Sequence, residues 1–295
     1  MRKAKSGARA QKVRSVSLAI SARLRAVRGF VFDLDGTLVL GDRHNTGLRV
    51  LPGAIELLEY LVRHGVPYVI LTNGTVRTPH QYADKVRMTG LPLPDERAML
   101  TPSSVAADYL ARRKFKRVLA LGPEGVWGPL RDAGLEIVHS PERAAVDAVF
   151  VGWYREFTMD DLEAACHAVW QGAKLFTSSL SPFFATAEGK AIGTSRAICA
   201  VITSLTGQRA TVLGKPSLEA LKSAARRMQL ATADLAVVGD DPALEVPMAH
   251  RGGAVAIAVA TGIGKFEDYA QLPRERRPHL AVENVAELLR EYRTG

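Results

Sequence analysis

The sequence contains little cysteine, few aromatic residues and no long uncharged run. Two cysteines among 295 residues, Cys166 and Cys199, are too few for a disulfide scaffold or a zinc site built from cysteine. They fit a reducing compartment, so a cytoplasmic location is expected. The longest uncharged stretches, such as residues 252–264, have 13 residues, whereas a membrane-spanning helix needs about 20. The sequence therefore predicts no membrane-spanning helix.

Acidic residues are missing from the first 28 positions, which hold nine lysines and arginines. The remaining residues hold 30 basic and 30 acidic side chains, so the whole net charge of +9 lies in this N-terminal extension. We predict that residues 1–28 are disordered or partly helical. A neutral body argues against a nucleic-acid-binding surface. For the extension itself, an anchor for anionic lipid or nucleic acid and a transit peptide remain open interpretations.

Short runs that are apolar throughout alternate with amphipathic helical patterns. Runs without polar alternation are typical of strands buried on both faces, as in a parallel sheet. The predicted strands are residues 29–34, 67–71, 211–213, 235–238 and 254–259. This alternation predicts an α/β fold with a mostly parallel, doubly wound sheet.

A long interval separates the second predicted strand from the third. Between Asn73 and Lys215 lie 141 residues, which contain strand-like runs at 117–121, 148–151 and 174–177. A helix is expected to begin after Thr158, because Asp161 three residues later completes a capping box. We therefore predict that residues 114–188 form an inserted α/β domain, and that residues 29–113 and 189–295 together form the core.

Polar and charged residues follow four of the predicted core strands. They are Asp33 and Asp35, then Thr72, Asn73 and Gly74, then Lys215, and finally Asp240. The carboxyl ends of parallel strands form the ligand-binding edge of an open α/β sheet. Carboxylates crowded at that edge repel one another unless a cation compensates them, and hard oxygen ligands favour Mg²⁺. With a lysine and glycine-rich turns, the set would hold a phosphate, leaving one aspartate as nucleophile and the other as acid and base.

These motifs resemble those of the haloacid dehalogenase superfamily. Residues 33–38 (DLDGTL) are similar to its first motif, Thr72-Asn73 to the second, Lys215 to the third, and residues 239–241 (GDD) to the fourth. The single long insertion and the string at 214–217 (GKPS) resemble subfamily IIA, which has a C2-type cap. That subfamily includes NagD-like nucleotide phosphatases, p-nitrophenylphosphatases, phosphoglycolate phosphatases and pyridoxal phosphatases. The resemblance implies a Rossmann-like core with an inserted cap.

The resemblance also implies a role for each motif residue. Asp33 would form an aspartyl-phosphate, and Asp35 would protonate the leaving group and then activate water. Lys215 would neutralise the nucleophile and the phosphate. Phosphate oxygens would be held by Thr72 and by main-chain amides near Asn73 and Gly74. Mg²⁺ would bind Asp33, Asp240 and the main-chain carbonyl of Asp35.

The expected activity is a Mg²⁺-dependent hydrolysis of a small phosphorylated metabolite: a phosphoglycolate, sugar phosphate, nucleotide or pyridoxal phosphate. The fourth motif departs from the family pattern GDxxxTD, because Leu244 replaces its threonine and Glu245 its second aspartate. Residues 177–180 (TSSL) replace the usual TNPD, so no single relative supplies the substrate. A homodimer through the cap is possible on this reading. The alternative is a weakly catalytic or non-catalytic binding or regulatory protein that docks through its basic extension.

Overall fold

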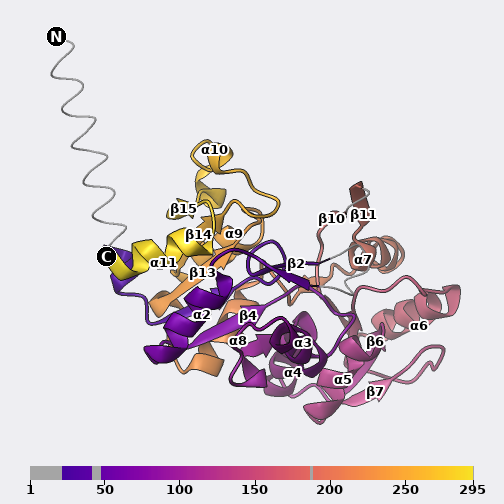
Figure 1. Ribbon diagram of the computed structural model, residues 1–295. Coiled ribbons are helices and arrows are strands. Elements are labelled where there is room, and N and C mark those ends of the chain that lie inside the picture. Colours follow the sequence, from indigo (N-terminus) through magenta and orange to yellow (C-terminus); the bar gives the residue numbers. More distant parts are fainter. Residues whose placement is uncertain (1–21, 42–47, 187–188, 295) are drawn as a thin grey trace.

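A computed structural model describes residues 22–41, 48–186 and 189–294, which form two parallel sheets surrounded by helices (Figure 1). The larger sheet has six strands in the order β15-β14-β13-β1-β4-β5, all paired in parallel. Its strands are β1 (Gly29–Phe32), β4 (Tyr68–Leu71), β5 (Met99–Leu100), β13 (Leu235–Gly239), β14 (Val255–Val259) and β15 (Leu280–Val282). Chain order runs outward in both directions from β1, so the predicted doubly wound α/β fold is confirmed.

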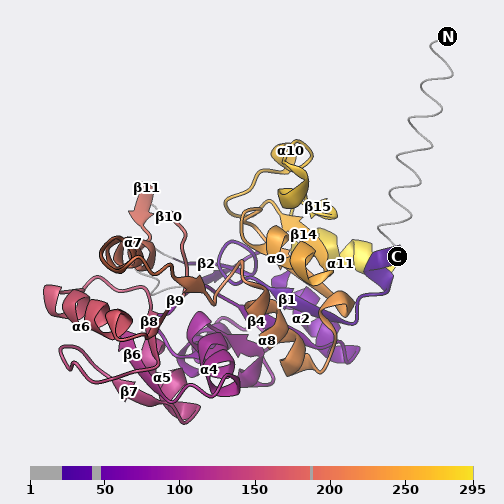
Figure 2. The same cartoon turned by 180° about the vertical axis from the view of Figure 1, so that it is seen from behind.

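Helices cover both faces of the larger sheet, which explains why its strands are apolar throughout. Phe30 and Phe32 on β1 pack in one cluster with α2 (Ala54–Arg63), α3 (Pro79–Met88) and α11 (Val285–Thr294). Val31 points to the opposite face and packs in a cluster with α8 (Leu218–Met228) and α9 (Glu245–Gly252). Figure 1 shows α2 and α11 in front of this sheet, and the reversed view in Figure 2 brings α8 to the front. Successive side chains of a strand point to opposite faces, so both faces need apolar residues.

The second sheet has five strands in the order β12-β9-β8-β6-β7. They are β6 (Arg117–Leu121), β7 (Glu136–Val138), β8 (Ala148–Val151), β9 (Lys174–Thr177) and β12 (Thr211–Val212). The three strands predicted within the inserted interval are confirmed as β6, β8 and β9. One face packs against α6 (Met159–Trp170) and α7 (Thr194–Thr206), and the other against α5 (Glu124–Asp132) and α4 (Pro102–Arg112). Thr158 and Asp161 form the predicted capping box at the start of α6.

One predicted core strand belongs to the other sheet. Residues 211–213 were expected beside the core strands, but β12 pairs in parallel with β9, with Thr211 opposite Phe176. The prediction of its sheet was wrong because a short apolar run indicates a strand without indicating its neighbour. Helix α7 also packs with the second sheet, although both elements lie beyond residue 188. This pairing favours an inserted unit that continues to about Val212, and its exact boundaries remain a proposal.

Two hairpins and several short elements complete the described chain. β10 (Phe183–Thr186) pairs antiparallel with β11 (Gly189–Ile192), and β2 (Val39–Gly41) with β3 (Leu48–Val50). The short elements are η1 (Glu96–Ala98), η2 (Thr232–Asp234), α10 (Phe266–Tyr269) and η3 (Arg274–Arg276). Among the described helices, none combines the length and apolar character that crossing a membrane requires.

The predicted N-terminal extension overlaps the folded body. Residues 1–21 lie outside the described part, but residues 22–25 are helical and Leu24 and Val27 are buried in the cluster around Phe30. The main-chain N–H of Arg28 donates to the carbonyl of Asp234 at 2.8 Å. These contacts favour a folded body that begins before residue 28, and the boundary of the extension remains a proposal. Alternating small and basic residues concealed two core positions.

Removing residues 1–21 should leave turnover of small substrates within about threefold, because Leu24 and Val27, the buried side chains of the predicted extension, remain. Retention on an anionic matrix at low salt should fall, since basic residues without compensating acids would be lost. Kinetics and retention of the truncated and full-length proteins test this. A second truncation through Arg28 is the contrasting variant, and it should lower the free energy of unfolding by about 3 kcal/mol through loss of Leu24 and Val27. Loss of turnover in a folded protein that starts at residue 22 would contradict the expectation.

Candidate active site

Three neighbouring strands of the larger sheet end in polar residues at the same edge. β13, β1 and β4 lie side by side, and they run directly into Asp240, Asp33 and Thr72. Strand register brings these ends together, because Phe32 pairs with both Val238 and Ile70. The convergence expected from the sequence therefore exists for these three strands. Lys215 arrives differently, from the loop between β12 and α8.

Lys215 lies between two buried carboxylates. Its Nζ pairs with Asp33 Oδ1 and, at 2.8 Å, with Glu245 Oε1. The residues are 3%, 7% and 1% exposed, so the three charges are almost completely removed from water. Breaking such a pair by removing one partner is costly, because the other charge is left buried and uncompensated. The ammonium is thereby fixed beside the Asp33 carboxylate.

The two carboxylates decide the protonation state of Lys215. Burial alone lowers the pKa of this ammonium, but Asp33 and Glu245 outweigh burial and raise the pKa above its ordinary value. The lysine is therefore positively charged at neutral pH. Burial also raises the pKa of Glu245, which the charge of Lys215 counteracts. The Glu245 side chain approaches Gly239 so closely that a Cβ at that position would lie 2.2 Å from its Cγ.

Asp240 is held by the loop that follows β14. Its Oδ2 accepts the N–H of Ile263 at 2.7 Å, and its main-chain carbonyl accepts the N–H of Gly264 at 3.0 Å. Gly36 has a φ of +82°, and a Cβ there would lie 2.5 Å from Asp240 Oδ2. Only glycine fits this close approach in the left-handed region. Burial, followed by the charges of Asp33 and Glu245, raises the pKa of Asp240 strongly.

Asp35 differs from the buried carboxylates because its side chain is accessible to water. Desolvation by the surrounding protein, followed by the charge of Asp33, nevertheless raises its pKa to about 6. Lys215 and Lys85 on α3 act in the opposite direction. A carboxyl group with a pKa near neutral can give up and take back a proton during a reaction.

The turn after β4 presents one hydroxyl group and a closely packed glycine. Thr72 Oγ1 accepts the N–H of Gly74 at 3.0 Å, which leaves the threonine hydroxyl proton to donate elsewhere. A Cβ on Gly74 would lie 2.1 Å from the hydroxyl oxygen of Tyr82. The Gly74 amide, expected to hold phosphate, is thus engaged with Thr72 in this structure. Thr72 remains the better placed donor of the two.

The Asn73 side chain connects the second and third motifs. Its Oδ1 accepts the N–H of Lys215 at 2.8 Å, and its Nδ2 donates to the Lys215 carbonyl at 3.1 Å. Both polar atoms of the carboxamide are therefore occupied by the main chain of one residue. Asn73 holds the main chain that carries Lys215, and any contact with phosphate is left to its own main-chain N–H. The sequence placed both residues at the site, but their 142-residue separation concealed the contact.

Replacing Asn73 with alanine should lower kcat about 10- to 100-fold with a smaller change in KM, because the main chain carrying Lys215 would lose both bonds and its ammonium would shift. Steady-state kinetics of the purified variant measures this. Asn284→Ala is the matched control: its Oδ1 accepts the N–H of Glu287 at the start of α11, so its loss should cost stability and leave kcat unchanged. A wild-type kcat in Asn73→Ala would show that these two hydrogen bonds do not position the lysine.

The donor set fits a small divalent cation. Among the described residues, no group of three or more histidine, cysteine, aspartate or glutamate side chains forms a metal cage. Mg²⁺ does not need such a cage, since it is usually held by one or two carboxylates, waters and substrate phosphate. Asp33 and Asp240 supply two carboxylates on adjacent strands, and the strongly raised pKa of Asp240 indicates anionic crowding that a cation would relieve. The main-chain carbonyl of Asp35 is a further oxygen on the same loop.

Three contributors to this site were missed or left open by sequence reasoning. In the sequence Glu245 was only a departure from the aspartate of the family pattern, yet its carboxylate forms an ion pair with Lys215. The main-chain N–H of Ile263 donates to Asp240, and the type of side chain at position 263 gives no indication of this contact. Arg251, on α9, donates to the carbonyl of Pro216 at 2.9 Å and so supports the loop next to Lys215. Only the replacement of aspartate by glutamate at 245 was visible as a signal.

Known proteins resemble this chain across nearly all of its length. Residues 30–136 match the family of haloacid dehalogenase-like hydrolases, and residues 212–288 match a second model of this hydrolase type. The 5'-nucleotidase YutF of Bacillus subtilis is 27% identical over 264 residues, covering 90% of this chain and 98% of the relative.

Solved structures agree with these matches. NagD from Escherichia coli K-12 superposes with a TM-score of 0.77 at 26% identity, covering 88% of this chain and 98% of that one. A glycerol phosphate phosphatase from Mycobacterium tuberculosis, solved in complex with magnesium, gives a TM-score of 0.77 at 25% identity, covering 92% and 77% of the two chains.

Proposed function

Because the chain is a haloacid dehalogenase-like hydrolase of the NagD-like subfamily IIA, a phosphoric monoester hydrolase, we propose that it cleaves small phosphomonoesters through an aspartyl-phosphate at Asp33. The observation that carries this proposal is the grouping of Asp33 and Asp240, at the carboxyl ends of adjacent strands, with Lys215 from the loop after β12. Two carboxylates and a buried ammonium supply a nucleophile, ligands for a cation and a counter-charge for phosphate. Phosphoryl transfer depends mainly on such positioning and charge neutralisation.

In the first half-reaction Asp33 acts as the nucleophile. One carboxylate oxygen is paired with Lys215, so the other is free to attack phosphorus. As the new P–O bond forms, the bond from phosphorus to the ester oxygen breaks, and Asp35 donates its proton to the leaving alkoxide. The pKa of about 6 supports this role, because about one Asp35 side chain in ten is then protonated at pH 7, far more than for an ordinary aspartate.

In the second half-reaction Asp35, now ionised, removes a proton from water. The resulting hydroxide attacks phosphorus, the bond to Asp33 breaks, and inorganic phosphate leaves with the carboxylate restored. Lys215 remains next to Asp33 throughout and offsets negative charge on the carboxylate and phosphate. The hydroxyl of Thr72 donates to a phosphate oxygen, since its lone pair already accepts from Gly74. The main-chain N–H of Asn73 completes the cradle, because the N–H groups of Thr72 and Gly74 already donate to the Leu100 carbonyl and to Thr72 Oγ1.

Mg²⁺ is the cofactor that the donor set fits best. Asp33, Asp240 and the main-chain carbonyl of Asp35 would hold it, and Ile263 and Gly36 keep the Asp240 carboxylate in place. When bound, the ion would neutralise charge on the transferring phosphoryl group. The loop at 261–264 thus acts on metal affinity through Asp240.

Chelation with EDTA should reduce turnover of p-nitrophenyl phosphate by at least about 100-fold, and excess Mg²⁺ should restore it, because the crowded carboxylates would lose their compensating cation. Ca²⁺ should bind and inhibit, since its larger and looser coordination displaces Asp33. Direct Mg²⁺ binding by titration calorimetry is the second readout, and Asp240→Asn should weaken that binding. Full turnover in EDTA-treated, metal-free protein would contradict the proposed cofactor.

The inserted unit acts as a cap in this proposal. A cap that closes over the site excludes bulk water and leaves room only for a small substrate, which favours a metabolite over a macromolecule. The substrate class stays as broad as phosphoglycolate, sugar phosphates, nucleotides and pyridoxal phosphate. A homodimer through the inserted unit and a cytoplasmic location remain predictions. The alternative of docking through the basic extension depends on residues 1–21, which lie outside the described chain.

A panel of phosphomonoesters tests the proposed activity. The purified full-length protein with Mg²⁺ should release inorganic phosphate from small monoesters, with kcat/KM differing among leaving groups because the cap contacts them. Phosphodiesters should not be cleaved, since their single charge offers less to the cation and Lys215. Absence of phosphate release from every monoester, in a folded protein that binds Mg²⁺, would contradict the proposal.

A further inference from the structure

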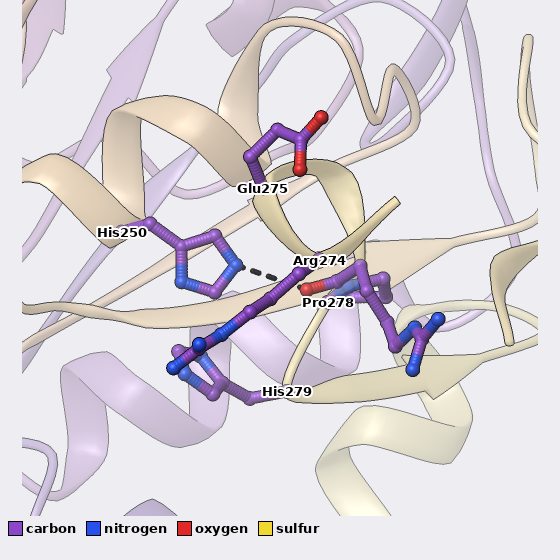
Figure 3. A pocket seen from close by; sticks show the side chains of 6 residues that line it. His250, Arg274, Glu275, Pro278 and His279 are labelled. Carbon is purple, nitrogen blue, oxygen red and sulfur yellow. Dashed lines mark hydrogen bonds between the residues drawn. The ribbon is translucent and has the colours of Figure 1, made fainter. Parts of the chain in front are cut away.

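A cleft of about 540 Å³ lies between the end of α9 and the segment around η3. Its lining consists of His250, Arg274, Glu275, Arg277, Pro278 and His279 (Figure 3). The cleft is separate from the candidate active site, because Glu245 stands at the first residue of α9 and His250 in its last turn. An eight-residue helix is about 12 Å long, so the two sites lie near its opposite ends.

The histidines of this cleft are held in defined tautomers. His279 Nδ1 accepts the N–H of Ala256 at 2.9 Å, so the neutral ring carries its proton on Nε2 and remains a donor there. His250 Nε2 lies 2.9 Å from the Arg277 carbonyl, which can only accept, and this fixes the proton of His250 on Nε2. A metal ion requires a ring nitrogen with a free lone pair, and His279 offers none. The His279 ring therefore suits a ligand that accepts hydrogen bonds.

Positive charge dominates the remaining lining. Within the described chain, Arg274 has no carboxylate partner, and Figure 3 shows its side chain extending toward the two histidine rings. Arg277 donates through Nε and Nη2 to the carbonyl of Leu272, which fixes its guanidinium and leaves Nη1 available. Burial lowers the pKa of His279 to about 4, and the positive charge of Arg23, from the N-terminal helical residues, contributes in the same direction. Glu275 is the one acidic lining residue, and its carboxylate points away from the histidines.

We propose that this cleft binds an oligophosphate anion, such as pyrophosphate or the phosphate chain of a nucleotide, at a site distinct from the catalytic centre. Guanidinium groups match phosphate oxygens with paired N–H donors, and two arginines, Arg274 and Arg277, are among the lining residues of this cleft. The Nε2–H of His279 adds a neutral donor. The chemistry of all three groups calls for an anion with several oxygens. The site stands on its own contacts and does not depend on the proposed function.

Hydrogen exchange measured by mass spectrometry, with pyrophosphate as the probe, tests the proposal. Pyrophosphate should protect amides in residues 273–282 of the full-length protein, and protection should weaken as salt increases. Arg274→Gln should raise the pyrophosphate concentration for half-maximal protection about tenfold, as loss of one charge-assisted contact does. Arg274→Gln together with Arg277→Gln should abolish protection.

Arg276→Gln is the matched control, because it removes the same charge from the same short helix but does not line the cleft. It should keep the wild-type response, and Glu275→Gln should bind at least as tightly as wild type. Unchanged KM for p-nitrophenyl phosphate shows that each variant is folded and that its active site is intact. No protection in the wild-type protein, or equal protection in Arg274→Gln and Arg276→Gln, would overturn the proposal. Protection confined to the turns at residues 72–74 and 214–217 would do the same, since pyrophosphate would then occupy only the active site.

Discussion

Asp33→Asn is expected to lower kcat by about 10⁴-fold or more, because a carboxamide cannot form the acyl phosphate on which the mechanism depends. The substitution is nearly isosteric, so the shape of the site is preserved. It also removes one of the two negative charges paired with Lys215. Steady-state hydrolysis of p-nitrophenyl phosphate measures the effect.

Asp234→Asn is the matched control for this experiment. Asp234 precedes β13 at the opposite edge of the same sheet, where it pairs with Arg28 at 3.5 Å. The same chemical change there should leave kcat within about twofold, since an exposed pair contributes little. Thermal unfolding of both variants shows whether each is folded. Substantial turnover by folded Asp33→Asn would refute Asp33 as the nucleophile.

Asp35→Asn is expected to lower kcat about 10²- to 10⁴-fold for alkyl phosphates, the range of a lost general acid and base. The loss in the first step should be smaller for p-nitrophenyl phosphate, because p-nitrophenolate leaves without needing a proton. With that substrate the second step would become limiting, and phosphoenzyme should accumulate. Rapid-quench measurement of a burst of p-nitrophenolate, one equivalent per site, reports this.

The dependence on leaving group separates this role from a structural one. A variant damaged only in its fold should lose activity equally toward alkyl and aryl phosphates. Glu156→Gln, a change of an exposed carboxylate on the loop after β8, is a suitable control and should show neither the loss nor the burst. Equal losses for both leaving groups in Asp35→Asn, without a burst, would assign Asp35 no part in proton transfer.

The sequence predicted the position of those site residues that directly follow a recognisable strand. Asp33, Thr72 and Asp240 each follow a run of buried apolar residues, and parallel strands bring such ends to one edge. The other strands predicted for the core were confirmed for the same reason, except residues 211–213, which form a strand of the second sheet. β5 and β15 escaped notice because they are only two and three residues long. The family resemblance added roles that spacing alone could not supply.

The parts that the sequence could not predict depend on contacts between distant segments. Residues 211–213 form a strand as expected, but nothing local says that it joins β9 instead of the larger sheet. The two hydrogen bonds between the Asn73 side chain and the main chain of Lys215 join loops 142 residues apart. Glu245 illustrates a third limit, because the sequence showed only that glutamate replaces the second aspartate of the family pattern, and its ion pair with Lys215 became visible in the structure. The type of a residue indicates which interactions its side chain can make, and the fold decides which partner it contacts.

The most direct test of the account is chemical trapping of the phosphoenzyme. Asp35→Asn would be mixed with p-nitrophenyl phosphate and Mg²⁺, quenched in acid, and treated with borohydride, which reduces an acyl phosphate to an alcohol with release of phosphate. Peptide mass spectrometry should then find homoserine in place of aspartate at position 33 and nowhere else. Asp33→Asn/Asp35→Asn should show no such conversion. Unmodified Asp33 in protein that has released a burst of p-nitrophenolate, or conversion at a different carboxylate, would contradict the mechanism.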